Sequence, residues 1–186
     1  MKAYKPLLRK TVIYKNFKLI PIRYEDRYLI MKWRNEQIYH LRQNDPLTVK
    51  VQDEYFDNVI SELFKQDKPK QILFSLLKDN KCIGYGGLVH INWVDKNAEI
   101  SFIMDTKLEK INFKSYWKLF LKLLEIVAFQ ELKFHKIYTF AYELREQLFE
   151  VLKDCNYLQE AVLKEHVLIN DYFVNALIHS KINKTN

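Results

Sequence analysis

The chain has 186 residues, of which 48% are hydrophobic and 28% charged, and its formal net charge is +7. This length suits one domain with a sizeable core, and the many large apolar residues exclude a disordered chain. No apolar run reaches the roughly 20 residues that span a bilayer, and the charged N-terminus is unlike a signal peptide. We therefore expect one domain over 1–186, with 1–16 and 183–186 peripheral, in a cytoplasmic protein that binds no membrane.

The basic charge does not by itself identify a partner. Lysines and glutamates are interspersed, and such a balance suits nucleic acid, a small polyanion or an ordinary solvated surface. Because no nucleic-acid-binding motif is present, we expect no nucleic-acid partner, and that alternative rests on charge alone. Cys82 and Cys155 are far apart and have no metal-ligand spacing. We expect them to be buried reduced thiols, and we expect no metal site.

Hydrophobic periodicity predicts a mixed order of strands and helices. Thr48 is the expected N-cap of the second helix. Between the predicted strand 98–104 and the third helix, the polar stretch DTKLEKINFKS is expected to be a connection. The predicted strands are 17–23, 71–77, 82–92, 98–104, 136–142, 158–168 and 172–182, and the predicted helices are 24–35, 48–64, 116–132 and 144–155.

The stretch 81–132 organises the rest of the chain. Two β-patterned runs joined by a polar turn lead into a long amphipathic helix. All three glycines of the protein, Gly84, Gly86 and Gly87, lie in the first run. Glycines inside a strand indicate a bulge or a close approach to the backbone, so we expect the functional site here.

This order of elements, with IGYGGL before the turn and NAEISF after it, resembles the GNAT superfamily of N-acyltransferases. The likeness covers about 17–182 and is strongest to the branch of ribosomal-protein and nucleotide-amino-sugar N-acetyltransferases. It implies an α/β (mixed α+β) fold, a single GNAT-like domain with a twisted, mostly antiparallel sheet of about seven strands and about four flanking helices. It also implies acetyl-CoA as co-substrate and no metal.

The resemblance places acyl-CoA along the strand that contains Phe102, Ile103 and Met104. Its pyrophosphate would lie at the next helix N-terminus, where free N–H groups favour an anion. The usual glycine-rich stretch is replaced by INFKSYW, so side chains are expected to bind the phosphates. The candidates are Lys110, Asn112, Lys114 and Ser115, with Arg145 at the start of the later helix, whose usual tyrosine general acid maps to Leu152.

The resemblance also suggests catalytic groups. Glu99 stands where an acidic residue often serves as general base, although it also reads as an exposed glutamate at a strand end. His90 lies across the turn from Glu99 and is a candidate proton relay, whereas a lone histidine on a sheet is commonly structural. A backbone N–H in the strand 102–104 would polarise the carbonyl oxygen.

For the acceptor, the run Trp33-Arg34-Asn35 resembles the WRN of the amino-sugar branch. Arg34 is expected to pair with a phosphate or carboxylate, and Arg42 lies in the following loop. The competing interpretation is structural: a tryptophan on the core face of a helix and an arginine at its C-terminus, where the helix dipole favours a cation.

These observations predict an acyl-CoA-dependent N-acyltransferase, most simply an acetyltransferase, acting by direct attack of a small-molecule primary amine. A nucleotide-linked amino sugar for surface polysaccharide is the first candidate, and the N-terminal amine of a protein is the competitor. A catalytically inactive GNAT-like binding protein is the alternative, because Phe113 and Trp117 would fill the cofactor groove. A homodimer is compatible with the fold, whose strand edges often pair between subunits.

Overall fold

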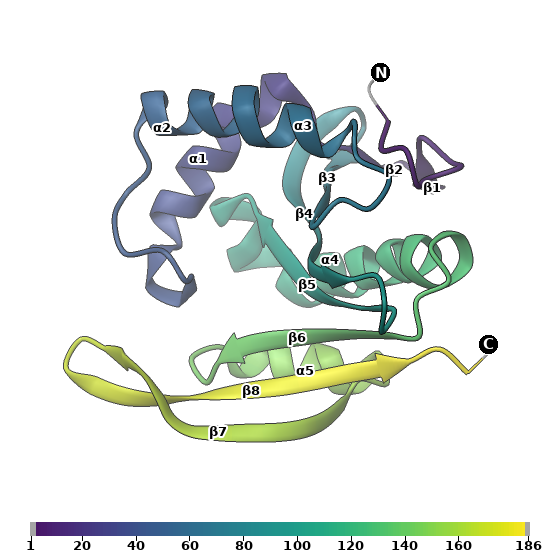
Figure 1. The fold of residues 1–186 in the computed structure, drawn as a ribbon. Coiled ribbons are helices and arrows are strands. Elements are labelled where there is room, and N and C mark those ends of the chain that lie inside the picture. The colour runs from purple at the N-terminus through teal and green to yellow at the C-terminus, as the bar shows by residue number, and fades with distance from the viewer. Residues whose placement is uncertain (1–2, 185–186) are drawn as a thin grey trace.

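The structure is a computed structural model that describes residues 3–184 of the chain. One eight-stranded sheet runs through it in the order β1-β2-β3-β4-β5-β6-β8-β7 (Figure 1). All neighbouring strands are antiparallel except β5 and β6, which are parallel. The strands are β1 (Val12–Tyr14), β2 (Phe17–Pro21), β3 (Ile72–Lys78), β4 (Lys81–Asn92), β5 (Asn97–Met104), β6 (Lys136–Tyr142), β7 (Leu158–Ile169) and β8 (Tyr172–Ile182).

Four helical bodies flank the sheet, as expected. The second is continuous, because a π-helical segment, Tyr55–Ile60, joins α2 to α3, and Thr48 Oγ1 caps it by accepting a hydrogen bond from Val51 N. We find no helix within residues 3–184 with the length and hydropathy that a bilayer crossing requires. The helices are α1 (Arg27–Glu36), α2 (Val49–Glu54), α3 (Ser61–Leu63), α4 (Thr106–Glu125), extended by a π segment to Glu131, and α5 (Glu146–Asp154).

The predicted fold class is confirmed, with two corrections near the N-terminus. The short strand β1 brings the sheet to eight strands rather than seven. Part of the segment expected to be peripheral lies in the core: Tyr4 is 1% exposed and stacks on Phe64 at 4.3 Å. Its hydroxyl accepts a hydrogen bond from Leu73 N at 3.0 Å. Periodicity missed Tyr4 because an isolated aromatic residue forms no repeating pattern.

The glycines of β4 serve the packing of neighbouring strands. A Cβ added at Gly86 would lie 2.1 Å from the carbonyl oxygen of Ser101, and one at Gly87 would lie 2.0 Å from that of Ile72. The close approach that the sequence indicates is therefore made by β3 and β5. Gly86 and Gly87 thus allow β4 to pack closely between β3 and β5.

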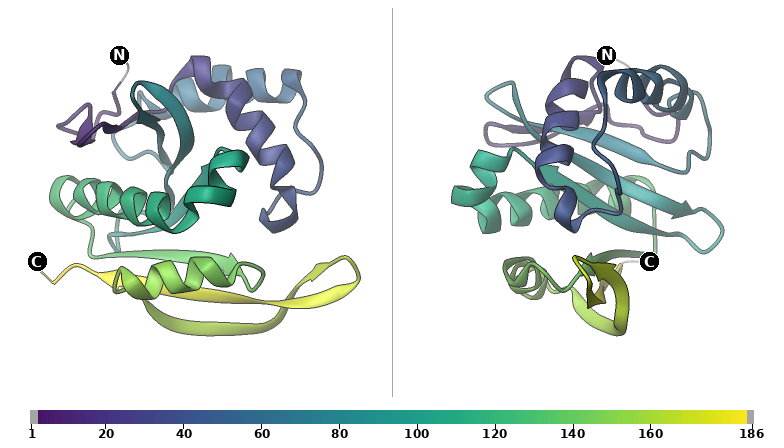
Figure 2. Two further views of the ribbon diagram at one scale, coloured as in Figure 1. Left: turned by 180° about the vertical axis from the view of Figure 1, so that it is seen from behind. Right: turned by 90° about the vertical axis from the view of Figure 1, so that its left-hand side faces the viewer.

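The cleft of the molecule arises where β5 and β6 part. They pair only over 97–99 and 136–138, and beyond this point they diverge (Figure 1). Helices α4 and α5 lie side by side on one face of the sheet (Figure 2), where Phe102 of β5 stacks on Phe120 of α4 at 3.9 Å. Ser101 points to the other face, toward a cavity lined by α1 and α2.

The connection expected at 105–115 is helical instead. Asp105 ends β5 and caps α4, because its Oδ1 accepts hydrogen bonds from the N–H groups of Lys107 and Leu108 at 2.8 and 3.2 Å. Asn112 interrupts the helix with φ −122° and ψ 16°. Aspartate is a strong N-cap, and the lysines and glutamate that follow favour helix, so local chemistry overrides the lack of an apolar stripe.

Candidate active site

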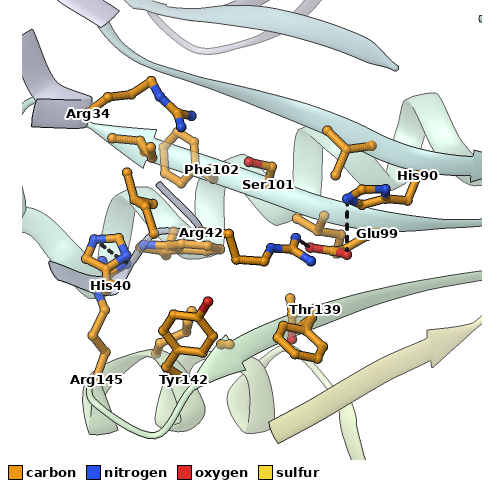
Figure 3. Close-up of a pocket in the computed structure, with 18 of the residues that line it drawn as sticks. Arg34, His40, Arg42, His90, Glu99, Ser101, Phe102, Thr139, Tyr142 and Arg145 are labelled. Atoms are coloured by element: carbon orange, nitrogen blue, oxygen red, sulfur yellow. Dashed lines mark hydrogen bonds and ion pairs between the residues drawn. The ribbon is translucent and has the colours of Figure 1, made fainter. Parts of the chain in front are cut away.

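The diverging strands enclose a cleft of about 530 Å³ (Figure 3). Its walls come from β4, β5 and β6, from α4 and α5, and from the loop that follows α1. Most of the charged side chains drawn in Figure 3 point into this space. Residues from distant parts of the chain therefore meet where the sheet opens.

Glu99 is at the closed end of the cleft and is only 5% exposed. Arg42 donates a hydrogen bond from Nη2 to Glu99 Oε1, and its guanidinium lies 5.1 Å from the centre of the Phe140 ring. His90 Nε2 is 3.9 Å from Glu99 Oε2. The structure thus brings together the two predicted catalytic residues and one predicted acceptor residue. Glu99 is not the exposed strand-end residue of the competing interpretation.

A β-bulge aims His90 at Glu99. The β4–β5 register passes from Val89 opposite Glu99 to Asn92 opposite Asn97, so β4 carries one extra residue here. His90 itself has φ 48°, a left-handed conformation that is uncommon outside glycine. Bulges next to functional sites commonly redirect a side chain. No sequence signal reveals this bulge.

Of the predicted acceptor residues, Arg34 and Arg42 reach the cleft and the other two do not. Arg34 Nη1 donates to the Tyr85 hydroxyl at 2.8 Å, and Arg34 also lines an adjoining cavity of about 270 Å³. Trp33 is 1% exposed in the core, which corrects its predicted role. Asn35 also has a structural role, because its side chain bonds Leu47 N and Leu47 O at 2.7 and 2.9 Å and holds the loop after α1.

The backbone of β5 presents polar groups to the cleft. Asp105 N donates to Ile83 O, so by strand alternation the backbone groups of Phe102 and Met104 face away from β4. Gln37 Nε2 already donates to Met104 O at 2.8 Å. The N–H and C=O of Phe102 therefore remain directed toward the open cleft. Gln37 was not among the predicted residues.

The predicted phosphate ligands on α4 mostly point elsewhere. Lys114 Nζ pairs with Glu150 at 2.5 Å, and exposed Ser115 donates to Asn112 O at 3.0 Å within the helix. In the helical start of α4, Lys114 and Ser115 face outward and line neither this cleft nor the cavity beside it, so their role as phosphate ligands stays a prediction. Asn112 forms the kink. Lys110 lines a second cavity, of about 710 Å³, at the N-terminal ends of α4 and α5.

Arg145 lines both cavities. Its Nη2 donates to Glu109 Oε1, and its Nη1 lies 3.2 Å from Nε2 of His40. Burial, followed by the charge of Arg145, lowers the pKa of His40 from 6.5 to about 3. The His40 imidazole is therefore neutral at physiological pH. Nothing in the spacing of His40 in the sequence indicates the contact with Arg145.

Residues 20–177 match the family described as the acetyltransferase (GNAT) domain, which is more than half of the chain. The chain belongs to the acetyltransferase (GNAT) domain family. It is accordingly a GNAT N-acetyltransferase, and acetyl-CoA is the co-substrate typical of this family. No curated protein is similar enough to the chain to match it.

Solved structures share the GNAT fold at low sequence identity. Spermidine N-acetyltransferase from Vibrio cholerae in complex with CoA and spermine is 17% identical, with a TM-score of 0.77 over 91% of this chain and 96% of that chain. The dodecameric form of the same enzyme in an intermediate state is 16% identical, with a TM-score of 0.77 over 93% of this chain and 100% of that one. At such identities the likeness shows the fold alone.

The GNAT co-substrate fits one end of this site better than the other. The cleft and the outward-facing backbone of Phe102 suit an acylated, amide-containing arm. At the end where the phosphates would lie, the chain has no glycine-rich loop. Two backbone N–H groups in the first turn of α4 already donate hydrogen bonds to the Asp105 carboxylate. The second cavity does not replace this loop, because its lining sets four carboxylates, Glu36, Glu109, Glu143 and Glu146, against the cations Lys110 and Arg145.

Proposed function

We propose that this GNAT enzyme acetylates the primary amine of a small molecule that also carries a phosphate or carboxylate. The charge of the cleft carries the proposal. Within the described chain its lining contains Arg34, Arg42 and Arg145 but one carboxylate, Glu99. An excess of positive charge attracts an anionic acceptor and opposes a polyamine, whose groups are all cationic. A nucleotide-linked amino sugar has the required chemistry.

Acetyl-CoA supplies a thioester carbonyl to the cleft. Glu99 takes a proton from the acceptor ammonium, so that the neutral amine forms the carbon–nitrogen bond as the carbon–sulfur bond breaks. The nitrogen then loses a second proton to become the amide, and this loss balances the proton that the leaving thiolate takes up. The N–H of Phe102 donates to the carbonyl oxygen as negative charge develops there. For Glu99 to act, Arg42 must leave it, and the anionic group of the acceptor offers Arg42 a new partner. His90 relays the proton from Glu99 to solvent.

Tyr142 is placed to protonate the leaving sulfur. The usual tyrosine position is occupied by Leu152, which is fully buried. Tyr142 lines the cleft with its hydroxyl directed inward (Figure 3), and burial raises its pKa, so the phenol keeps its proton at neutral pH. A covalent route through Cys82 is disfavoured, because burial raises the pKa of this thiol to about 12.

Two other acceptors and one non-catalytic role are alternatives to this proposal. Spermidine is acetylated by the structural neighbours, and a protein N-terminus is the within-class competitor. The alternative of a catalytically inactive binding protein rests on Phe113 and Trp117 filling the cofactor groove. Phe113 and Trp117 are 8% and 4% exposed, and Trp117 forms part of the wall of the open cleft. The space between β5 and β6 therefore stays available for a substrate.

A substrate panel tests the proposal. The purified protein would be incubated with acetyl-CoA and, in turn, a UDP-linked amino sugar, an amino sugar phosphate, spermidine and a short peptide with a free N-terminus. Released thiol and product mass are measured. We expect acetylation of the anionic amines first. Preferential acetylation of spermidine, or no turnover with any anionic amine, would overturn the proposal.

A further inference from the structure

Arg34 is the one arginine without an acidic partner among the residues that the structure describes. The protein has six arginines, and the other five each lie within ion-pair distance of a carboxylate. Arg34 is half-buried and donates to two neutral groups, from Nε to Gln43 Oε1 at 2.9 Å and from Nη1 to the Tyr85 hydroxyl at 2.8 Å. These bonds leave its charge uncompensated and leave further guanidinium N–H donors for an anion.

The loop after α1 holds the Arg34 guanidinium in place. Gln43 Nε2 donates to Asn35 Oδ1 at 3.2 Å and to Asp45 O at 3.0 Å, so the amide that accepts from Arg34 is itself fixed. Asn35 in turn bonds the backbone of Leu47. A cation oriented by such a network loses little conformational freedom when it binds a ligand, which favours tight binding.

The same loop carries Arg42. This residue directly precedes Gln43, and its side chain reaches Glu99 from there. When Arg42 leaves Glu99, as the proposed mechanism requires, its backbone stays next to the residue that bonds Arg34. Both arginines line the cleft, and the terminal oxygens of one phosphate can accept hydrogen bonds from two guanidinium groups. The loop thus allows Arg34 and Arg42 to bind one phosphate together.

Arg34 lies along β5 from the proposed base. Glu99, Ser101 and Ile103 face the same side of the sheet by strand alternation. Ser101 and Arg34 both line the cavity of about 270 Å³. Tyr85, which bonds Arg34, lies opposite Ile103. Ser101 and Ile103 are two and four residues beyond Glu99, or about 7 and 13 Å along the strand.

We propose that Arg34 binds a phosphate of the acceptor while the amine lies at Glu99, and that Arg42 joins this phosphate after leaving Glu99. The enzyme then selects amines whose phosphate lies about 7–13 Å from the nitrogen. An amine with its phosphate on the neighbouring carbon is too short to reach both residues. This inference rests on the proposed function, because it takes Glu99 as the base and an anionic amine as the acceptor.

Two aminoalkyl phosphates measure this spacing. Aminoethyl phosphate holds its nitrogen and its phosphate close together, whereas aminohexyl phosphate spans the required distance. Their binding to the purified protein would be measured by calorimetric titration in the absence of acetyl-CoA. We expect the wild type to bind aminohexyl phosphate about tenfold or more tightly, because only the longer molecule reaches both Arg34 and Glu99.

Two substitutions disable Arg34 in different ways. Arg34→Gln removes the cation, and Gln43→Glu gives it an internal carboxylate in place of a neutral amide. Each should weaken binding of aminohexyl phosphate about tenfold or more and remove its advantage over aminoethyl phosphate. The control is Lys32→Gln, which removes a positive charge from the same helix but lies outside the cleft and the adjoining cavity. This control should bind both phosphates as the wild type does.

Melting temperatures report whether each variant is folded, and the comparison of the two phosphates in the wild type stands without any variant. Equal binding of the two phosphates by the wild type would overturn the spacing. An advantage of aminohexyl phosphate that survives both substitutions would overturn the role of Arg34. Either result leaves the proposed function in place as long as anionic amines are acetylated. The proposed function fails separately, if no anionic amine of the substrate panel is acetylated.

Discussion

The Glu99 carboxylate and the His90 imidazole lie 3.9 Å apart because a bulge in β4 turns His90 toward the next strand. Glu99 is almost fully buried and is also bonded by Arg42, whereas the His90 side chain is 63% exposed. The exposed His90 imidazole gives protons on the buried Glu99 carboxylate a route to solvent. This arrangement supports Glu99 as base and His90 as relay.

Replacing Glu99 by Gln should leave the fold intact and slow turnover. Glutamine keeps the shape of the side chain but cannot accept the amine proton, so kcat should fall by about 10²–10⁴-fold. Steady-state kinetics and acetyl-CoA titration would be measured together, with Glu54→Gln on the exposed surface of α2 as control. Unchanged turnover by Glu99→Gln would exclude it as the base.

Tyr142→Phe should lower kcat without weakening either substrate. The phenol is proposed to donate only to the departing sulfur, and phenylalanine preserves its ring contact with Phe140, whose centroid is 6.3 Å away. The loss should shrink with a donor whose thiol is more acidic, because such a leaving group needs less protonation. If kcat falls equally with acetyl-CoA and with the more acidic thiol donor, or falls with neither, then another group protonates the sulfur.

His40 should make the enzyme less stable in mild acid. Its folded pKa of about 3 lies below the unfolded value of 6.5. Between these values the unfolded chain binds a proton that the folded chain does not, so the free energy of unfolding falls as pH drops, by at most about 1.4 kcal/mol per pH unit. Above about pH 6.5 this penalty is absent.

Urea unfolding near neutral pH and near about pH 5 measures this effect. The wild type should lose more stability over this interval than His40→Gln, which cannot take up the proton. Equal losses in the two proteins would show that His40 titrates normally in the folded state.

The glycines of β4 should differ in their tolerance of alanine. The added Cβ meets backbone oxygen at 2.1 Å at Gly86 and 2.0 Å at Gly87, but at 2.9 Å at Gly84. Overpacking typically costs about 1–3 kcal/mol, and clashes with backbone lie at the high end. Denaturant unfolding should rank Gly84→Ala as the mildest change. A larger loss at Gly84 than at Gly87 would contradict the packing described for these strands.

Sequence patterns predicted the fold because its signals are local. The apolar stripe of each helix and the hydrophobic run of each strand occupy one continuous segment. Thr48 is an N-cap residue directly before the helix that it caps. The start of α4 was missed because Asp105 sets it by capping, without an apolar stripe. The helical start also makes Lys114 and Ser115 face outward, which the sequence did not indicate.

The site was predictable only in part, since long-range contacts create it. Glu99 and Arg42 were both predicted as site residues, but their pairing depends on how the loop after α1 crosses the sheet. Trp33 was misassigned because a buried tryptophan and a ligand-stacking one look alike in sequence. The contact of Arg145 with Glu109 joins two helices that no short motif connects.

The charge of the acceptor tests the central claim most directly. The kcat/KM of the best anionic amine would be compared with that of the same amine lacking its phosphate or carboxylate, in the wild type and in Arg42→Gln. We expect a preference of about tenfold or more for the anionic amine in the wild type, falling toward unity in the variant. Equal kcat/KM values for the two amines in the wild type, or a preference for the uncharged one, would contradict an anionic acceptor.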